Sequence, residues 1–104
     1  MPIINSADIL VIGAGPAGYT AGLYGSRAGR QTILLDKGIG GGQLATTFRI
    51  ENYPGVSGGI SGFELAETMK EQALHFGAQV DQTEVLSLRK EQELFQVETT
   101  NGTY

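Results

Sequence analysis

Three glycines at fixed spacing lie near the start of the chain, in the stretch Gly13-Ala14-Gly15-Pro16-Ala17-Gly18. In this G-x-G-x-x-G pattern the first glycine allows a tight turn, and the second lets the backbone approach a pyrophosphate. The third lets a helix pack closely on a strand. The pattern alone is weak evidence, because glycines also serve ordinary turns. Here it follows an apolar run and precedes a helix-forming stretch, which is the context that a dinucleotide site requires.

Asp36 is the next residue with suitable chemistry. It follows the third glycine by 18 residues and ends a second apolar run. A carboxylate at this place accepts hydrogen bonds from the hydroxyls of an adenosine ribose, whereas it repels a 2′-phosphate. NADP is therefore the poorest candidate ligand, and the pattern by itself leaves NAD and FAD open.

A polar, glycine-rich stretch then runs from Gly41 to Gly55, with the sequence GGQLATTFRIENYPG. Half of the chain's 16 glycines lie between Gly38 and Gly62. The isoalloxazine ring of a flavin needs donors and acceptors along its pyrimidine edge, and this stretch offers them. They are the backbone N–H groups of Gly40, Gly41 and Gly42, the amides of Gln43 and Asn52, and the hydroxyls of Thr46 and Thr47. The stretch therefore favours a flavin over a nicotinamide.

The elements that must position these residues follow from the apolar pattern. Residues 8–12 and 32–36 read as strands buried on both faces of a parallel sheet. A helix from Pro16 to about Ala28 connects them, which predicts a right-handed βαβ unit. Its predicted packing face carries Ala17, Ala21, Tyr24 and Ala28. Gly22 and Gly25 each cost about 1 kcal/mol in a helix interior, so they indicate close packing on the sheet.

A second helix begins at the capping box formed by Ser61 and Glu64 and ends at Gly77. Strands are expected at 78–80, 84–88 and 94–99, followed by a hairpin turn at Asn101-Gly102. The return strand is two residues long when the chain stops. We therefore expect the 104 residues to be an incomplete segment of a longer domain.

Composition excludes several kinds of partner and site. The net charge of −4 argues against nucleic acid and against an acidic membrane surface. The chain has no cysteine, which excludes disulfides and thiolate metal sites within it. No signal peptide or membrane-spanning run is evident, so we expect a cytoplasmic protein. The single histidine, His75, is expected at a helix end, and no residue is predicted to be catalytic.

Four motifs together resemble the thioredoxin reductase family of FAD- and NADPH-dependent disulfide reductases. They are GAGPAGYTA (13–21), GGQL (41–44), ENYPG (51–55) and GISGFEL (59–65). Their order and spacing match over essentially the whole chain. The resemblance implies an α/β, Rossmann-like FAD-binding domain with a parallel sheet, helices and a β-meander. Residues 1–104 would be the first segment of this domain, and the NADPH domain and closing FAD segment would lie outside the chain.

The resemblance also implies roles for individual residues. The pyrophosphate would be held by Gly13, Gly15, Pro16, Ala17 and Gly18, and the ribose by Asp36 with Lys37 nearby. The flavin side would be lined by Gly42, Gln43, Leu44, Thr47 and Asn52. Val85, in a strand after the second helix, would meet the adenine through its backbone.

The family's redox-active Cys-x-x-Cys is absent, so this chain is not expected to reduce a disulfide alone. NADPH, and a thioredoxin-like or ferredoxin-like partner, would belong only to the full enzyme. Three alternatives remain open. They are a fragment of a thioredoxin reductase-like ferredoxin/flavodoxin–NADP reductase, a NAD-binding module, and a non-catalytic truncation product that binds a nucleotide or only self-associates, for example as a homodimer.

Overall fold

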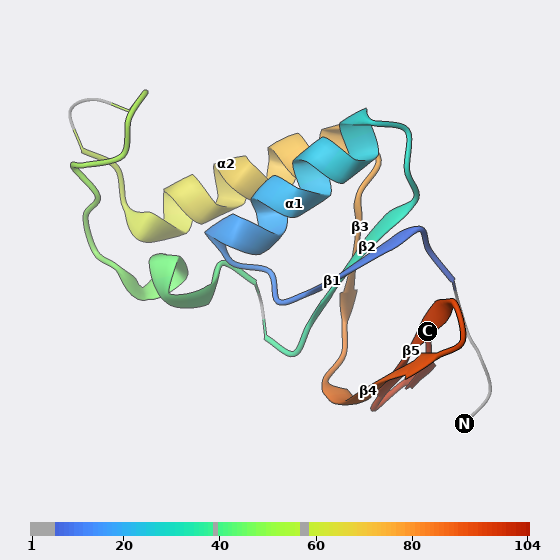
Figure 1. The fold of residues 1–104 in the computed structure, drawn as a ribbon. Coiled ribbons are helices and arrows are strands. Elements are labelled where there is room, and N and C mark those ends of the chain that lie inside the picture. The colour runs from blue at the N-terminus through green and yellow to red at the C-terminus, as the bar shows by residue number, and fades with distance from the viewer. Residues whose placement is uncertain (1–5, 39, 57–58) are drawn as a thin grey trace.

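The computed structural model describes residues 6–38, 40–56 and 59–104, and its elements form three layers (Figure 1). Two helices cover one face of a parallel sheet, and an antiparallel meander lies against the other face. This is the predicted α/β arrangement. Neither described helix is long and apolar enough to cross a membrane.

The parallel sheet has the order β1-β2-β3, with β1 at Ile9–Ile12, β2 at Thr32–Asp36 and β3 at Gln79–Gln82. The central strand β2 is buried along all of its length except Asp36, as predicted. The prediction that β1 is buried on both faces is wrong, since Ile12 at its end is 54% exposed. The reason is that Ile12 ends β1 and lines two cavities, so no other side chains cover it fully.

Helix α1 spans Pro16–Arg27 and ends before Gly29, whose φ of 81° suits the C-terminal turn of a helix. The predicted packing face is wrong, because Ala17, Ala21 and Ala28 are exposed and Tyr24 is 62% exposed. The buried residues are Tyr19, Gly22, Gly25 and Ser26. A Cβ on Gly22 would lie 2.8 Å from Leu34 Cδ1, so this glycine does permit the close packing that was expected.

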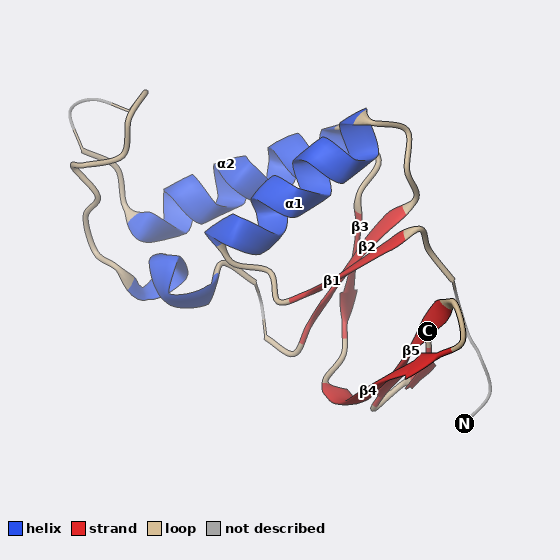
Figure 2. Ribbon diagram, viewed as in Figure 1, coloured by secondary structure: helices blue, strands red, loops and turns tan. Residues whose placement is uncertain are grey.

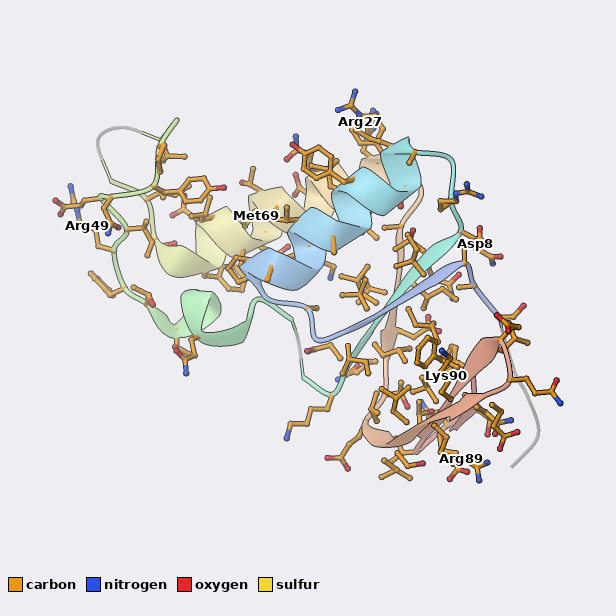
Figure 3. The ribbon with its side chains drawn as sticks, in the orientation of Figure 1. Asp8, Arg27, Arg49, Met69, Arg89 and Lys90 are labelled. Carbon is orange, nitrogen blue, oxygen red and sulfur yellow. The ribbon has the colours of Figure 1, made fainter. Side chains whose placement is uncertain are left out.

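Helix α2 spans Gly62–His75 and lies beside α1 on the same face of the sheet (Figure 2). Its start is the predicted cap, with the Glu64 N–H donating to Ser61 Oγ at 3.1 Å. Met69 lies next to α1 (Figure 3) and packs against the helix-side core. The core-facing residues are Leu65, Ala66 and Ala73, whereas Phe76, beyond the end of the helix, is 42% exposed.

Side chains of β2 alternate between the two layers. Leu34 points to the helix side, where it packs with Ala14, Tyr19, Ala73 and Ala78. Ile33 and Leu35 point to the meander side, where they pack with Val97 and Tyr104. The alternation follows from the pleat of a strand, and burial on both faces explains the continuous apolar run in the sequence.

The meander consists of β4 at Val85–Glu91, β5 at Leu94–Thr99 and the short β6 at Gly102–Thr103. All three strands are antiparallel, in the order β4-β5-β6. Side-chain hydrogen bonds tie this layer to β3. Tyr104 Oη donates to Asp81 Oδ2 at 2.5 Å, and Asn101 Nδ2, in the turn between β5 and β6, donates to Gln82 O at 3.2 Å.

Candidate functional site

The loop between β1 and α1 is closed by backbone contacts. Gly13 has a φ of 106°, which a side chain would disfavour, and its N–H donates to Leu35 O at 2.8 Å. A Cβ on Gly18 would overlap the carbonyl oxygen of Gly13. The first and third glycines of the pattern are therefore required by the fold of the loop itself.

The start of α1 offers free backbone donors. Gly15 is the N-cap and has no side chain to cap the helix, and Pro16 at the first position has no N–H. The first intrahelical bond runs from Tyr19 N–H to Gly15 O at 2.9 Å. The N–H groups of Ala17 and Gly18 precede it, so they have no acceptor within the helix and can bind an anion.

A second glycine-rich segment packs directly on this loop. Gly40, Gly41 and Gly42 have φ values of 88°, 88° and 57°, and the Gly41 N–H donates to Ala14 O. A Cβ on Gly42 would lie 3.4 Å from Gly15 Cα. The structure thus brings two segments together, backbone against backbone, that are separated in the sequence by α1 and β2.

The 3-10 helix η1, Gly42–Thr46, continues from this contact. The carbonyl oxygen of Gln43 accepts hydrogen bonds from the hydroxyls of Thr46 at 2.9 Å and Thr47 at 3.1 Å. The Gln43 side chain is exposed, so its amide is available to a ligand. Leu44 belongs to η1, but its side chain lies outside the described part of the structure.

Asp36 ends β2 and faces the phosphate-binding loop. Its Oδ1 accepts from Ala14 N–H at 3.0 Å, and its Oδ2 accepts from Gly38 N–H at 3.1 Å. Each carboxylate oxygen can accept more than one hydrogen bond, so capacity remains for ribose hydroxyls. The bond to Ala14 adds a role that was not predicted, because it fixes the loop to the end of β2.

Two cavities lie on either side of this carboxylate. One, with a volume of about 250 Å³, is lined by four predicted site residues, Gly13, Asp36, Lys37 and Val85, and by Ile12, Leu35, Thr83 and Glu84. The other, of about 380 Å³, is lined by Asp36, Lys37, Gly38, Gly40, Gly42, Thr46 and Phe63. The first has the apolar walls that an adenine needs, and the second leads from the carboxylate to η1.

Asn52 is a predicted site residue that the structure does not bring to these two cavities. It is exposed and belongs to the loop between η1 and α2. Arg49, three residues earlier in that loop, lies at the outer end of the molecule, beyond the helices (Figure 3). The loop of Asn52 thus extends away from the cavities that Gly13, Asp36, Lys37, Gly42 and Val85 line.

Sequence reasoning missed Phe63 and Glu84 as lining residues. Phe63 is 51% exposed and does not share the helical spacing of the core residues of α2, so no periodic signal marks it. Glu84 lies between β3 and β4, where the sequence shows only a break between two strands. No group of three or more acidic or histidine side chains in the described residues is arranged to hold a metal ion.

The donors and cavities fit a flavin dinucleotide: free N–H groups for phosphates, a carboxylate for a ribose, and a second polar segment beside them. A family model described as FAD binding domain matches residues 8–49. Thioredoxin reductase from Treponema pallidum is 42% identical over 97 residues, which cover 93% of this chain and 32% of that protein. The chain is a FAD-binding segment of a thioredoxin reductase-like flavoprotein.

Solved structures agree with this thioredoxin reductase-like assignment. A thioredoxin reductase from Gloeobacter violaceus superposes with a TM-score of 0.90 at 40% identity, over 94% of this chain and 31% of that one. The thioredoxin reductase of Bacillus subtilis is 51% identical over 72 residues, 69% of this chain and 22% of that protein. The predicted resemblance, fold class and FAD cofactor are confirmed. The chain spans about a third or less of the length of these relatives.

Proposed function

We propose that this segment holds FAD within a longer oxidoreductase of the thioredoxin reductase type, in which electrons pass from NADPH through FAD to a disulfide. Residues 1–104 would then be the first segment of the FAD domain. The observation that carries the proposal is the packing of Gly42 on Gly15, which joins an anion-binding helix start to a polar segment suited to a flavin.

The bound flavin would supply the redox chemistry, and this chain's residues would bind and orient it. The N–H groups at the start of α1 would bind the pyrophosphate, in the loop formed by Gly13, Gly15, Pro16, Ala17 and Gly18. Asp36 would accept from the ribose, and Lys37 and Val85 would line the adenine side. Gly42, Gln43, Leu44 and Thr47 would lie along the flavin, and Asn52 would join them only if its loop moves inward.

The electron acceptor and the assembly are further parts of this proposal. The relatives are named thioredoxin reductases, which supports a thioredoxin-like acceptor. The chain contains no cysteine, so a redox-active thiol pair would come from outside these 104 residues. A homodimer is also proposed, and molar mass measured against protein concentration tests it.

The ribose role of Asp36 is tested by Asp36→Asn, with Asp8→Asn as the matched control. Both carboxylates accept a backbone N–H, and Asp8 does so from Gln31 at 2.9 Å. Asp8, however, lies at the amino end of β1, the far end of the sheet from Asp36 (Figure 3). We expect Asp36→Asn to weaken FAD binding about tenfold or more, because hydrogen bonds to a charged acceptor contribute about 1.5–3 kcal/mol. Quenching of flavin fluorescence during a titration measures this affinity.

Asp8→Asn is expected to leave FAD affinity unchanged. Equal affinities for both variants and the unsubstituted chain would contradict the ribose role. Failure of the unsubstituted chain to bind FAD would contradict the proposal that the residues of this segment hold the cofactor.

A further inference from the structure

Tyr19 has a buried polar side chain that plays no part in the site described above. It lies one turn into α1, is 2% exposed, and packs within the helix-side core beside Ala14 and Leu34. The aromatic ring explains why the residue is buried, since the ring of a phenylalanine would pack in the same way. Its hydroxyl needs a separate explanation, because a buried hydroxyl is costly unless it has a polar partner.

The hydroxyl reaches the second glycine-rich segment. A Cβ on Gly40 would overlap Tyr19 Oη, so the hydroxyl lies against the backbone of that residue. The Gly41 N–H is close enough to the same oxygen to lower the pKa of the hydroxyl. Burial first, and then the negative charges of Asp36 and Glu67, raise the pKa of Tyr19, and the Gly41 N–H lowers it in part. The hydroxyl therefore remains protonated at neutral pH.

The Gly41 N–H is shared between Tyr19 and the phosphate-binding loop. It donates to Ala14 O in that loop. One residue later, Gly42 contacts Gly15 and begins η1. The position of Gly41 thus determines where η1 begins relative to the start of α1.

We propose that Tyr19 is a positioning residue for the flavin site, whose hydroxyl fixes the Gly40–Gly42 segment against the phosphate-binding loop. This inference rests on the proposed FAD site. It assigns Tyr19 no contact with the cofactor. Its effect is transmitted through Gly41 to η1, and so it concerns the flavin half of the ligand and not the adenosine half.

ADP and FAD separate these two halves. In the proposed site, ADP would require only the start of α1 and the cavity beside Asp36, whereas FAD would also require η1. Tyr19→Phe removes the hydroxyl and keeps the ring in the core. Tyr24→Phe is the matched control, because it removes the same atom from the same helix at a residue that is 62% exposed.

The experiment measures ADP and FAD affinity by calorimetry on the 104-residue chain, together with hydrogen exchange at the Gly41 amide without ligand. We expect Tyr19→Phe to weaken FAD binding by about 2–10-fold, the range for loss of one hydrogen bond. We expect ADP affinity to change by less than about twofold and the Gly41 amide to exchange faster. Tyr24→Phe should change none of the three.

Unchanged FAD affinity and unchanged exchange in Tyr19→Phe would overturn the inference. Equal losses of FAD and ADP affinity would also overturn it, because they indicate a general loss of structure. If the unsubstituted chain binds no FAD, the proposed function fails separately. Exchange at Gly41 in the unliganded chain then still decides whether Tyr19 holds the segment.

A double-mutant cycle with Gly40→Ala tests the contact between Tyr19 and Gly40 by changing the second partner. The added methyl group would overlap Tyr19 Oη, but it would lie 3.5 Å from Cζ, an ordinary contact, once the hydroxyl is removed. The strain from the φ of 88° is present in both backgrounds. We expect Gly40→Ala to be less destabilising in the Tyr19→Phe background, and purely additive effects would contradict the contact.

Discussion

At the scale of single residues, two glycines of the phosphate-binding loop have separable roles. A methyl group at Gly18 would overlap Gly13 O, which is backbone and cannot move aside cheaply. We expect Gly18→Ala to lower the free energy of unfolding by about 1–3 kcal/mol, the usual cost of overpacking. Urea-induced unfolding measures this change.

Gly15→Ala is the comparison variant. The φ of −97° at Gly15 is allowed for alanine, and the added Cβ would lie 3.8 Å from Gly42 Cα. We expect a smaller loss of stability than for Gly18→Ala, with clearly weaker FAD binding, because the methyl group enters the space between the two glycine-rich segments. Equal stability losses in the two variants, or FAD affinity unchanged in Gly15→Ala, would contradict this division of roles.

At the scale of elements, the hydrogen bond from Tyr104 to Asp81 joins the meander to β3. Burial, followed by this hydrogen bond and the charge of Asp81, raises the pKa of Tyr104 from its ordinary value of 10.0 to about 12. The folded state therefore holds the proton more tightly than the unfolded state. The stabilisation is complete below pH 10 and is lost as the pH rises from 10 through about 12.

We expect Tyr104→Phe to lower the free energy of unfolding at pH 8 by about 2 kcal/mol, since the lost hydrogen bond has a charged acceptor. Above pH 10 the difference from the unsubstituted chain should narrow. Urea unfolding at several pH values between 8 and 12 measures both effects. A difference that stays constant over this range would show that the hydrogen bond is not the cause.

Most elements could be predicted because their signals are local. The buried run of β2, the capping box of α2 and the hairpin after β5 each depend on a few neighbouring residues. The packing face of α1 could not be predicted in this way. Small residues occur all around that helix, and the side that packs is set by where Leu34 and Thr32 of β2 approach Gly22 and Gly25.

The same distinction applies to the site. The loop and Asp36 could be predicted because the motif fixes their spacing, and the structure brings them together. The positions of Tyr19 and Phe63 beside the site could not be predicted, because their surroundings depend on where the segment around η1 folds back. That segment has no helical or strand periodicity, so the sequence does not indicate which residues it meets.

At the scale of the whole molecule, the three layers place the phosphate-binding loop, Asp36, Lys37, Gly42 and Val85 around the carboxyl ends of the parallel strands. Asp36 ends β2, the phosphate-binding loop follows β1, and Thr83 and Val85 follow β3. This is the usual place for ligands on an open parallel sheet. The meander contributes Val85 to the same edge, so both layers that flank β2 participate in the site.

The pairs of neighbouring strands differ greatly in their separation along the sequence. β4 and β5 meet through a tight turn, with Glu91 opposite Leu94, whereas Ile33 of β2 pairs with Gln79 across the whole glycine-rich loop and α2. Closing the longer loop costs more chain entropy. During refolding we therefore expect amides of the β4–β5 hairpin to become protected earlier than those joining β2 and β3, as measured by pulsed hydrogen exchange. Simultaneous protection would mean that the parallel sheet and the hairpin form in one step, and that the nucleotide-binding edge is complete as soon as the chain is compact.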